Sequence, residues 1–156
     1  MKVKEIMSKN VITAQRSMKL KELLKIFKNF HIFPLVPVVE EDRRLVGVVS
    51  FRNLIDVFQS YKPDVLKLVP FLDEEDQDIF KIDISEEIGD LVVLEDIMEH
   101  EYIAIQEDVS LEDAYNLMKL NLKEELPVVD RAGRLTGRIG IFDIINSVFR
   151  QKGVIK

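Results

Sequence analysis

Two junctions between a predicted strand and a predicted helix carry residue types that could bind a nucleotide. They run from Gly47 to Asn53 and from Gly137 to Asp143. A glycine inside a strand lets another backbone or a ligand approach closely, and the start of the following helix offers free N–H groups to an anion. A carboxylate one turn into such a helix, as at Asp143, can accept hydrogen bonds from both hydroxyls of a ribose. The pattern therefore predicts a site for a nucleoside monophosphate.

The two junctions occupy equivalent places in an internal repeat, because residues 3–58 and 94–149 follow one pattern. Ile6-Met7 matches Ile97-Met98 at an offset of 91 residues. After a gap of one residue, Pro37-Val38-Val39 matches Pro127-Val128-Val129 at an offset of 90. A register kept over this length indicates a duplication.

Each repeat is predicted to form a strand, a helix, a two-stranded hairpin and a final helix. The first helix of repeat one follows a predicted cap at Ser17, and that of repeat two follows a predicted capping box of Ser110 and Asp113. The final helices are expected at about residues 51–58 and 141–149. The buried helix faces are predicted to be Leu20, Leu23, Leu24, Phe27 and Phe30 in repeat one, and Leu111, Ala114, Tyr115 and Met118 in repeat two.

The predicted fold class is α+β, with two βαββα repeats related by a pseudo-twofold axis. A repeat this short buries only a marginal core alone, so two repeats are expected to cover each other's apolar sheet faces. The predicted boundaries are residues 1–58 for repeat one and 94–150 for repeat two, followed by a C-terminal tail at 151–156. Residues 59–93 are predicted to be an acidic linker with a short helix over 64–69.

The Ile-Met opening, the Pro-Val-Val strand and the junction spacing Gly-h-h-Ser/Thr-x-x-Asp together resemble a tandem pair of CBS (cystathionine β-synthase) domains, also called a Bateman module. The resemblance spans both repeats. It implies a stand-alone regulatory module that binds an adenine nucleotide, AMP, ADP or ATP, or an S-adenosyl compound, in the cleft between the repeats. It also implies a homodimer that passes a change of conformation to an unidentified regulated protein.

The resemblance assigns the binding residues position by position. In this family the Ser/Thr and Asp of the junction meet phosphate and ribose, and backbone near the first strand and ahead of the Pro-Val strand frames adenine. Repeat one has Asn53 where Asp is expected and repeat two has Gly140 where a hydroxyl is expected, so the Asp143 site ranks first. Arg138 and Arg52 are predicted to add positive charge for the phosphate. The predicted residues are Val11, Ile12, His31, Phe33, Ser50, Arg52 and Asn53 from repeat one, and Tyr102, Ile103, Glu124, Glu125, Leu126, Arg138, Gly140 and Asp143 from repeat two.

Simpler interpretations stay open beside this one. Ser50, Asn53 and Asp143 are also ordinary residues for a helix start, and the repeats could serve only as a ligand-free scaffold for dimerisation or for docking on a transporter or enzyme. The acidic run at 73–78 lacks the ligand spacing of an EF-hand loop, and His31 and His100 form no metal spacing, so no metal site is predicted.

Composition narrows the classes of protein further. The chain has no cysteine, which excludes thiolate metal sites and cysteine nucleophiles, and no motif pairs a nucleophile with a base, so no catalytic residues are predicted. The net charge of −6 argues against nucleic-acid binding as the function, because proteins that bind nucleic acid usually carry a positive surplus. No apolar run approaches the about 20 residues of a membrane span, so we expect a cytoplasmic protein without direct membrane insertion.

Overall fold

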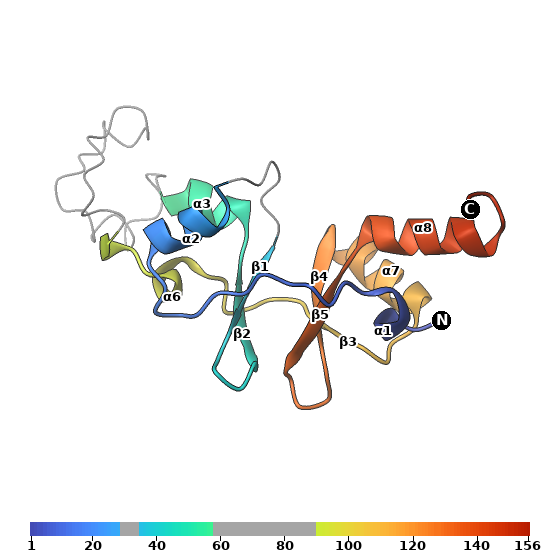
Figure 1. Ribbon diagram of the computed structural model, residues 1–156, viewed down its shortest axis with the longest axis horizontal. Coiled ribbons are helices and arrows are strands. Elements are labelled where there is room, and N and C mark those ends of the chain that lie inside the picture. Colours follow the sequence, from blue (N-terminus) through green and yellow to red (C-terminus); the bar gives the residue numbers. More distant parts are fainter. Residues whose placement is uncertain (29–34, 58–89) are drawn as a thin grey trace. The chain divides into compact units, whose positions relative to one another are not determined.

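The computed structural model describes residues 1–28, 35–57 and 90–156. Its backbone falls into two compact units (Figure 1), which do not follow the boundaries of the sequence repeats. The first unit contains residues 1–12, 39–45 and 101–156, and the second contains residues 13–38 and 46–100. Each unit therefore joins the body of one repeat to the opening segment of the other.

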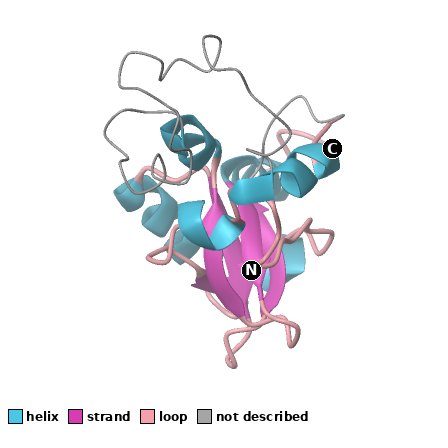
Figure 2. Cartoon of the chain, turned by 90° about the vertical axis from the view of Figure 1, so that its left-hand side faces the viewer, coloured by secondary structure: helices cyan, strands magenta, loops and turns pink. Residues whose placement is uncertain are grey.

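The first unit is built on a three-stranded sheet. Strand β3 (Ile105–Gln106) pairs in parallel with β4 (Glu125–Val129), which pairs antiparallel with β5 (Leu135–Gly140). Helices α1 (Val3–Ile6), α7 (Leu111–Asn121) and α8 (Ile141–Gln151) complete this unit, and Figure 2 colours the elements by type. Its buried core consists of Val3, Ile105, Leu111, Ala114, Met118, Leu126, Val128, Ile139 and Ile144.

The second unit repeats this plan with a smaller sheet. Strands β1 (Val36–Val39) and β2 (Leu45–Val49) form a two-stranded sheet, beside which lie helices α2 (Leu20–Ile26), α3 (Phe51–Val57) and α6 (Leu94–Ile97). The predicted first strand of repeat one is reduced to a single parallel bridge between Ala14 and Val38. The tip of the β1–β2 hairpin belongs to the first unit, where Leu45 N–H donates to Gly133 O at 3.0 Å.

The opening segments are held by backbone pairing that is equivalent in the two units. Ser8 and Arg138 exchange two N–H···O bonds of 2.9 Å in the first unit. Glu99 and Val48 exchange bonds of 2.8 and 3.1 Å in the second. The short helices α1 and α6, which periodicity did not predict, are the Ile-Met openings that lead into these pairs.

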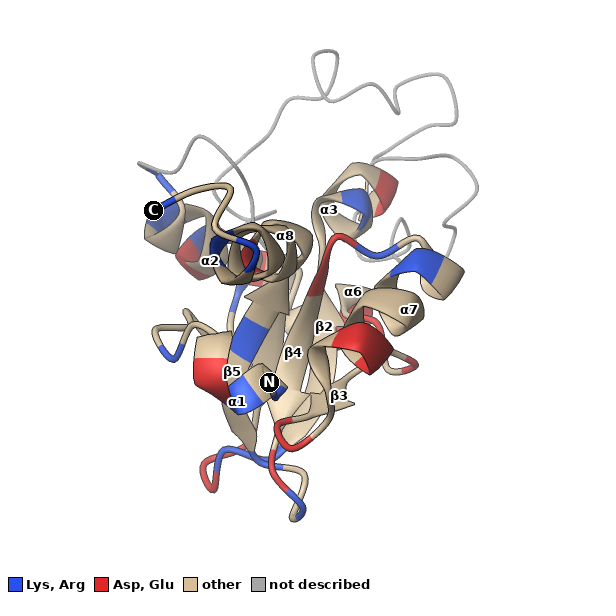
Figure 3. Ribbon diagram, turned by 90° about the vertical axis from the view of Figure 1, so that its right-hand side faces the viewer, with Lys and Arg blue, Asp and Glu red and all other residues tan. Residues whose placement is uncertain are grey.

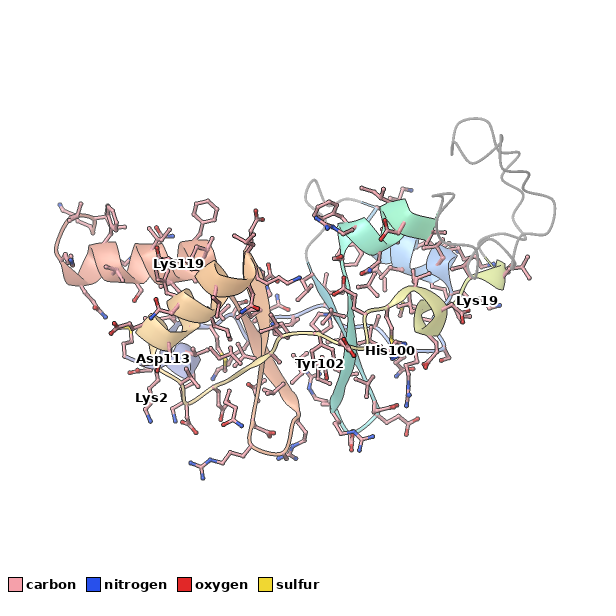
Figure 4. All side chains as sticks on the ribbon, turned by 180° about the vertical axis from the view of Figure 1, so that it is seen from behind. Lys2, Lys19, His100, Tyr102, Asp113 and Lys119 are labelled. Atoms are coloured by element: carbon pink, nitrogen blue, oxygen red, sulfur yellow. The ribbon has the colours of Figure 1, made fainter. Side chains whose placement is uncertain are left out.

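Helix α7 confirms the predicted start at Ser110, whose hydroxyl oxygen accepts from Asp113 N–H at 3.1 Å. Asp113 in its first turn and Lys119 in its last turn (Figure 4) complement the helix dipole. The predicted cap at Ser17 is wrong, because α2 begins at Leu20 and Lys19 N–H donates instead to Glu22 Oε2 at 3.0 Å.

Two side chains that were predicted to be buried are exposed. Leu24 and Tyr115 keep 51% and 40% of their surface. Both lie beside a stripe of buried residues spaced at three and four positions along the helix, so the buried face of each helix is narrower than predicted. Phe30, the predicted linker helix over 64–69 and the acidic run at 73–78 lie outside the described residues.

Candidate functional site

The junction in the first unit places Asp143 against the end of β5. Gly140 ends β5 and its N–H donates to Asp143 Oδ2 at 2.8 Å. The next amide, that of Ile141, donates to Glu124 O at 2.9 Å. The N–H of Gly140, which precedes α8, and the N–H of Ile141, its first residue, are thus satisfied within the protein. A phosphate at Gly140, as the sequence predicts, would have to displace the carboxylate of Asp143.

The junction in the second unit is built in the same way with uncharged groups. Ser50 donates from its N–H and its hydroxyl to Asn53 Oδ1, at 2.7 and 3.1 Å. Asn53 Nδ2 donates in turn to Glu99 Oε1 at 3.3 Å, so the orientation of the amide is fixed from outside the junction. The structure brings Ser50 and Asn53, two of the predicted binding residues, into contact with each other. Arg52 lies in the first turn of α3 and is exposed.

The two strand glycines serve a close approach of backbone. A Cβ atom built on Gly137 would lie 2.7 Å from Ser8 O and 2.9 Å from Met7 Sδ. A Cβ atom on Gly47 would lie 3.0 Å from both Glu99 O and Met98 Sδ. Of the two roles that the sequence left open for these glycines, approach of another chain segment is the one observed. The Ile-Met openings and the strand glycines are therefore one packing device.

An ion pair borders the junction of the first unit. Arg138 Nη1 donates to Glu125 Oε2 at 3.0 Å, and Glu125 lies opposite Gly140 in the β4–β5 ladder. Burial raises the pKa of Glu125, and the negative charge of Asp143 acts in the same direction against the lowering effect of Arg138. Figure 3 colours the positions of Lys and Arg blue and those of Asp and Glu red along the ribbon. The guanidinium that the sequence predicted for phosphate is thus bonded to a neighbouring carboxylate.

The predicted adenine-framing residues lie in two apolar environments. Tyr102, on the segment leading into β3 (Figure 4), packs with Val11 in a small cluster around Val39, Leu45 and Leu135. Its hydroxyl donates to Leu45 O at 3.0 Å, and burial raises the pKa of this hydroxyl.

The other predicted adenine-framing residues differ in how far their side chains are exposed to a ligand. Ile103 packs against the core of the first unit, and Ile12 is half-buried. Leu126 is part of that core at 1% exposure, so only its backbone is available to a ligand. Glu124 is exposed. His31 and Phe33 lie outside the described residues.

Sequence reasoning missed Glu99 as part of the second junction. Glu99 follows the Ile-Met opening of repeat two, and it reaches Asn53 only because that opening pairs with β2. Glu99 is equivalent to Ser8 of repeat one, because each follows an Ile-Met pair. Both pair with the strand that leads to a junction, so this shared position was the signal in the sequence.

Other features of the described residues do not compete with the junctions. An open pocket of about 480 Å³ in the first unit is lined by Lys4, Met7, Lys9, Glu107 and Thr136, none of which was predicted to bind a ligand. Within residues 1–28, 35–57 and 90–156, no group of three or more His, Asp or Glu side chains could hold a metal ion. No helix in these same ranges is long and apolar enough to span a membrane.

Comparison with protein families gives two matches in this chain. Residues 3–60 and 94–150 each match the family model of the CBS domain. The uncharacterized protein MJ1426 of Methanocaldococcus jannaschii is 27% identical over 155 residues, which cover 95% of this chain and 91% of that protein. Inosine-5′-monophosphate dehydrogenase of Aquifex aeolicus is 27% identical over 136 residues, 87% of this chain. The matched part is only 22% of the length of that enzyme.

Solved structures share the fold. CBSX2 in complex with AMP, a protein of Arabidopsis thaliana, superposes with a TM-score of 0.71 at 22% identity and covers 97% of this chain and 98% of that one. The CBS domain pair of MJ0100, in complex with 5′-methylthioadenosine and S-adenosyl-L-methionine, gives 0.63 at 24% identity with the same coverage. The cytosolic domain of the Mg²⁺ channel MgtE, in complex with ATP, gives 0.64 at 22% identity and covers 91% of this chain and 46% of that one.

Proposed function

Because the chain belongs to the CBS-domain family and is a tandem pair of these domains, we propose that it is a non-catalytic regulatory module that binds an adenosine ligand. The ligand class is an adenine nucleotide, AMP, ADP or ATP, or an S-adenosyl compound. The ligand changes the conformation of the module, and the change is passed to a partner protein. A ligand shifts such an equilibrium only through different affinities for the two conformations.

The observation that supports this proposal best is the construction shared by the two junctions. In both, a polar side chain at the third helical position bonds the N–H of the residue that precedes the helix, Asp143 with Gly140 and Asn53 with Ser50. The same groups can bond a ribose instead, because a carboxylate oxygen or an amide oxygen accepts from a hydroxyl. Three structural relatives carry adenosine ligands: AMP, 5′-methylthioadenosine with S-adenosyl-L-methionine, and ATP.

Asp143 is assigned the ribose in this proposal. Its Oδ2 accepts from Gly140 N–H, so binding of a ribose either uses the second oxygen or exchanges the backbone bond for a ligand hydroxyl. A hydrogen bond to a charged group contributes roughly 1.5–3 kcal/mol. Removal of the carboxylate should therefore weaken binding roughly tenfold or more.

The test is calorimetric titration of AMP, ADP, ATP and S-adenosylmethionine into the wild-type protein and into Asp143→Ala. Asp113→Ala is the matched control, since Asp113 is also the third residue of a helix and its Oδ2 also accepts from the residue that precedes that helix, the Ser110 hydroxyl at 2.8 Å. We expect at least one ligand to bind, and Asp143→Ala but not Asp113→Ala to weaken or remove a binding event. If no ligand binds, the module is not a nucleotide sensor.

Helix α8 supports a homodimer as part of the same proposal. Phe142, Ile145 and Phe149 lie on one face of this helix and expose 75%, 39% and 45% of their surfaces. An apolar face of this kind is typical of an interaction surface. Light scattering should give a dimer for the wild-type protein and a monomer for Phe142→Glu. A dimer together with failure to bind every adenosine ligand would favour the scaffold function instead.

A further inference from the structure

The junction of the first unit differs in charge from its counterpart in the second unit. Three carboxylates, those of Glu124, Glu125 and Asp143, lie at the end of β5 or directly across the ladder from it. Arg138 is the cation within this edge, and it is bonded to Glu125. Lys123, just after the end of α7, is exposed. Even when Lys123 is counted with Arg138, the three carboxylates exceed the two cations of this edge.

The equivalent positions of the second unit carry no such excess. Leu35 takes the place of Glu125 and Val48 that of Arg138 at the offset of 90 residues. Ser50 supplies a hydroxyl, and Arg52 and Glu99 bring one charge of each sign. The two junctions therefore share their backbone bonding but differ in the charges that surround the start of the helix.

Resting on the proposed function, we infer that the junction of the first unit selects an adenosine ligand whose 5′ substituent carries no negative charge, and that Glu125 is the residue that excludes phosphate. A thioether or a sulfonium group satisfies this condition, whereas the phosphates of AMP and ATP do not. Glu125 acts in two ways, by its own charge and by occupying the guanidinium of Arg138.

The bonding of the edge supports this selection. The N–H of Gly140, which precedes α8, is occupied by Asp143, and that of Ile141, the first residue of α8, by Glu124 O, so a phosphate finds neither of these two donors free. The second oxygen of Glu125, Oε1, is buried without a hydrogen-bond donor among the described residues. A phosphate dianion is an acceptor and cannot supply one. Burial and Asp143 already raise the pKa of Glu125, and a further negative charge nearby would act against the same ionised carboxylate.

The experiment compares 5′-methylthioadenosine with AMP by calorimetric titration into the wild-type protein, Asp143→Ala and Glu125→Gln. The binding event that Asp143→Ala removes identifies the first-unit junction. We expect 5′-methylthioadenosine to bind there at least roughly fivefold more tightly than AMP, since one unit charge at contact distance is worth roughly a factor of five even in water. Glu125→Gln should tighten AMP binding roughly fivefold and leave 5′-methylthioadenosine within about a factor of two.

Glu112→Gln is the control variant, because it removes the same charge from the same unit at the opposite end of α7. It should leave the ratio of the two affinities unchanged. The inference is overturned if AMP binds the Asp143-dependent site as tightly as 5′-methylthioadenosine, or if Glu125→Gln does not change the ratio. It is also overturned if ligands bind but Asp143→Ala affects none of them. Failure of both ligands and of ATP to bind at all would instead overturn the proposed function.

Discussion

Gly137 lies in β5 at the point where a side chain would meet the backbone of the N-terminal segment. A Cβ atom there would be 2.7 Å from Ser8 O, which also accepts from Arg138 N–H at 2.9 Å. Real Cβ atoms do not approach an oxygen this closely, so Gly137→Ala must move a segment held by two backbone bonds. Overpacking of this kind costs about 1–3 kcal/mol. Because the clashing atom belongs to paired backbone, we expect about 2 kcal/mol or more in the free energy of unfolding.

The matched variant is Gly47→Ala in the second unit. Its new Cβ atom would be 3.0 Å from Glu99 O and 3.0 Å from Met98 Sδ, so a smaller shift relieves the contact and about 1 kcal/mol is expected. Urea denaturation followed by circular dichroism measures both losses. If Gly137→Ala is as stable as the wild-type protein, or less destabilised than Gly47→Ala, the close approach of Ser8 does not govern this position.

Three further outcomes follow from the described contacts. Gly133 has a φ of 77° with nothing near its added Cβ atom, so Gly133→Ala should cost about 1 kcal/mol through backbone strain alone, measured by urea denaturation. Leu126→Ala should cost about 2–5 kcal/mol in the same assay, because the side chain is 1% exposed in the core of the first unit. Burial raises the pKa of Glu125 in the folded state, so the folded protein binds the proton of this carboxyl more tightly than the unfolded chain does. The protein therefore loses stability as the pH rises from the ordinary pKa of a glutamate through the raised pKa of Glu125. The decrease in stability over this window should therefore be smaller in Glu125→Gln, and an unchanged pH profile would contradict the assigned pKa shift.

The repeat was readable from sequence because both copies keep their apolar spacing and their turns. Helices α7 and α8 and the two hairpins lie where periodicity predicts them, and the CBS-domain matches confirm the family. The composition of the compact units was not predictable in this way. It depends on backbone pairing between residues far apart in the sequence, such as Val48 with Glu99, 51 positions apart, and Ser8 with Arg138, 130 positions apart, and local spacing carries no signal for partners so distant.

The candidate site shows the same division between local and distant information. The bond between Ser50 and Asn53 follows from a spacing of three residues, which sequence reasoning uses directly. The bond between Arg138 and Glu125 depends instead on the register of β4 against β5, and a register shift of one residue would send the two side chains to opposite faces. Arg138 was therefore predicted as a partner for phosphate when the structure pairs it with a carboxylate. The assignment of ligands to all these residues stays a prediction.

The capping bond at Asp143 links the candidate site to the surface proposed for dimerisation. Asp143 satisfies the N–H of Gly140 at the start of α8, and the same helix exposes Phe142 and Phe149. Loss of a helix cap costs about 1 kcal/mol, so a ligand that takes the carboxylate away from Gly140 gives up roughly a factor of five in affinity unless it satisfies that N–H itself. The start of α8 is then less stable in the ligand-bound state than in the ligand-free state. A ligand at Asp143 can in this way favour one arrangement of the exposed face without contacting it, which is the differential affinity that a regulatory module requires.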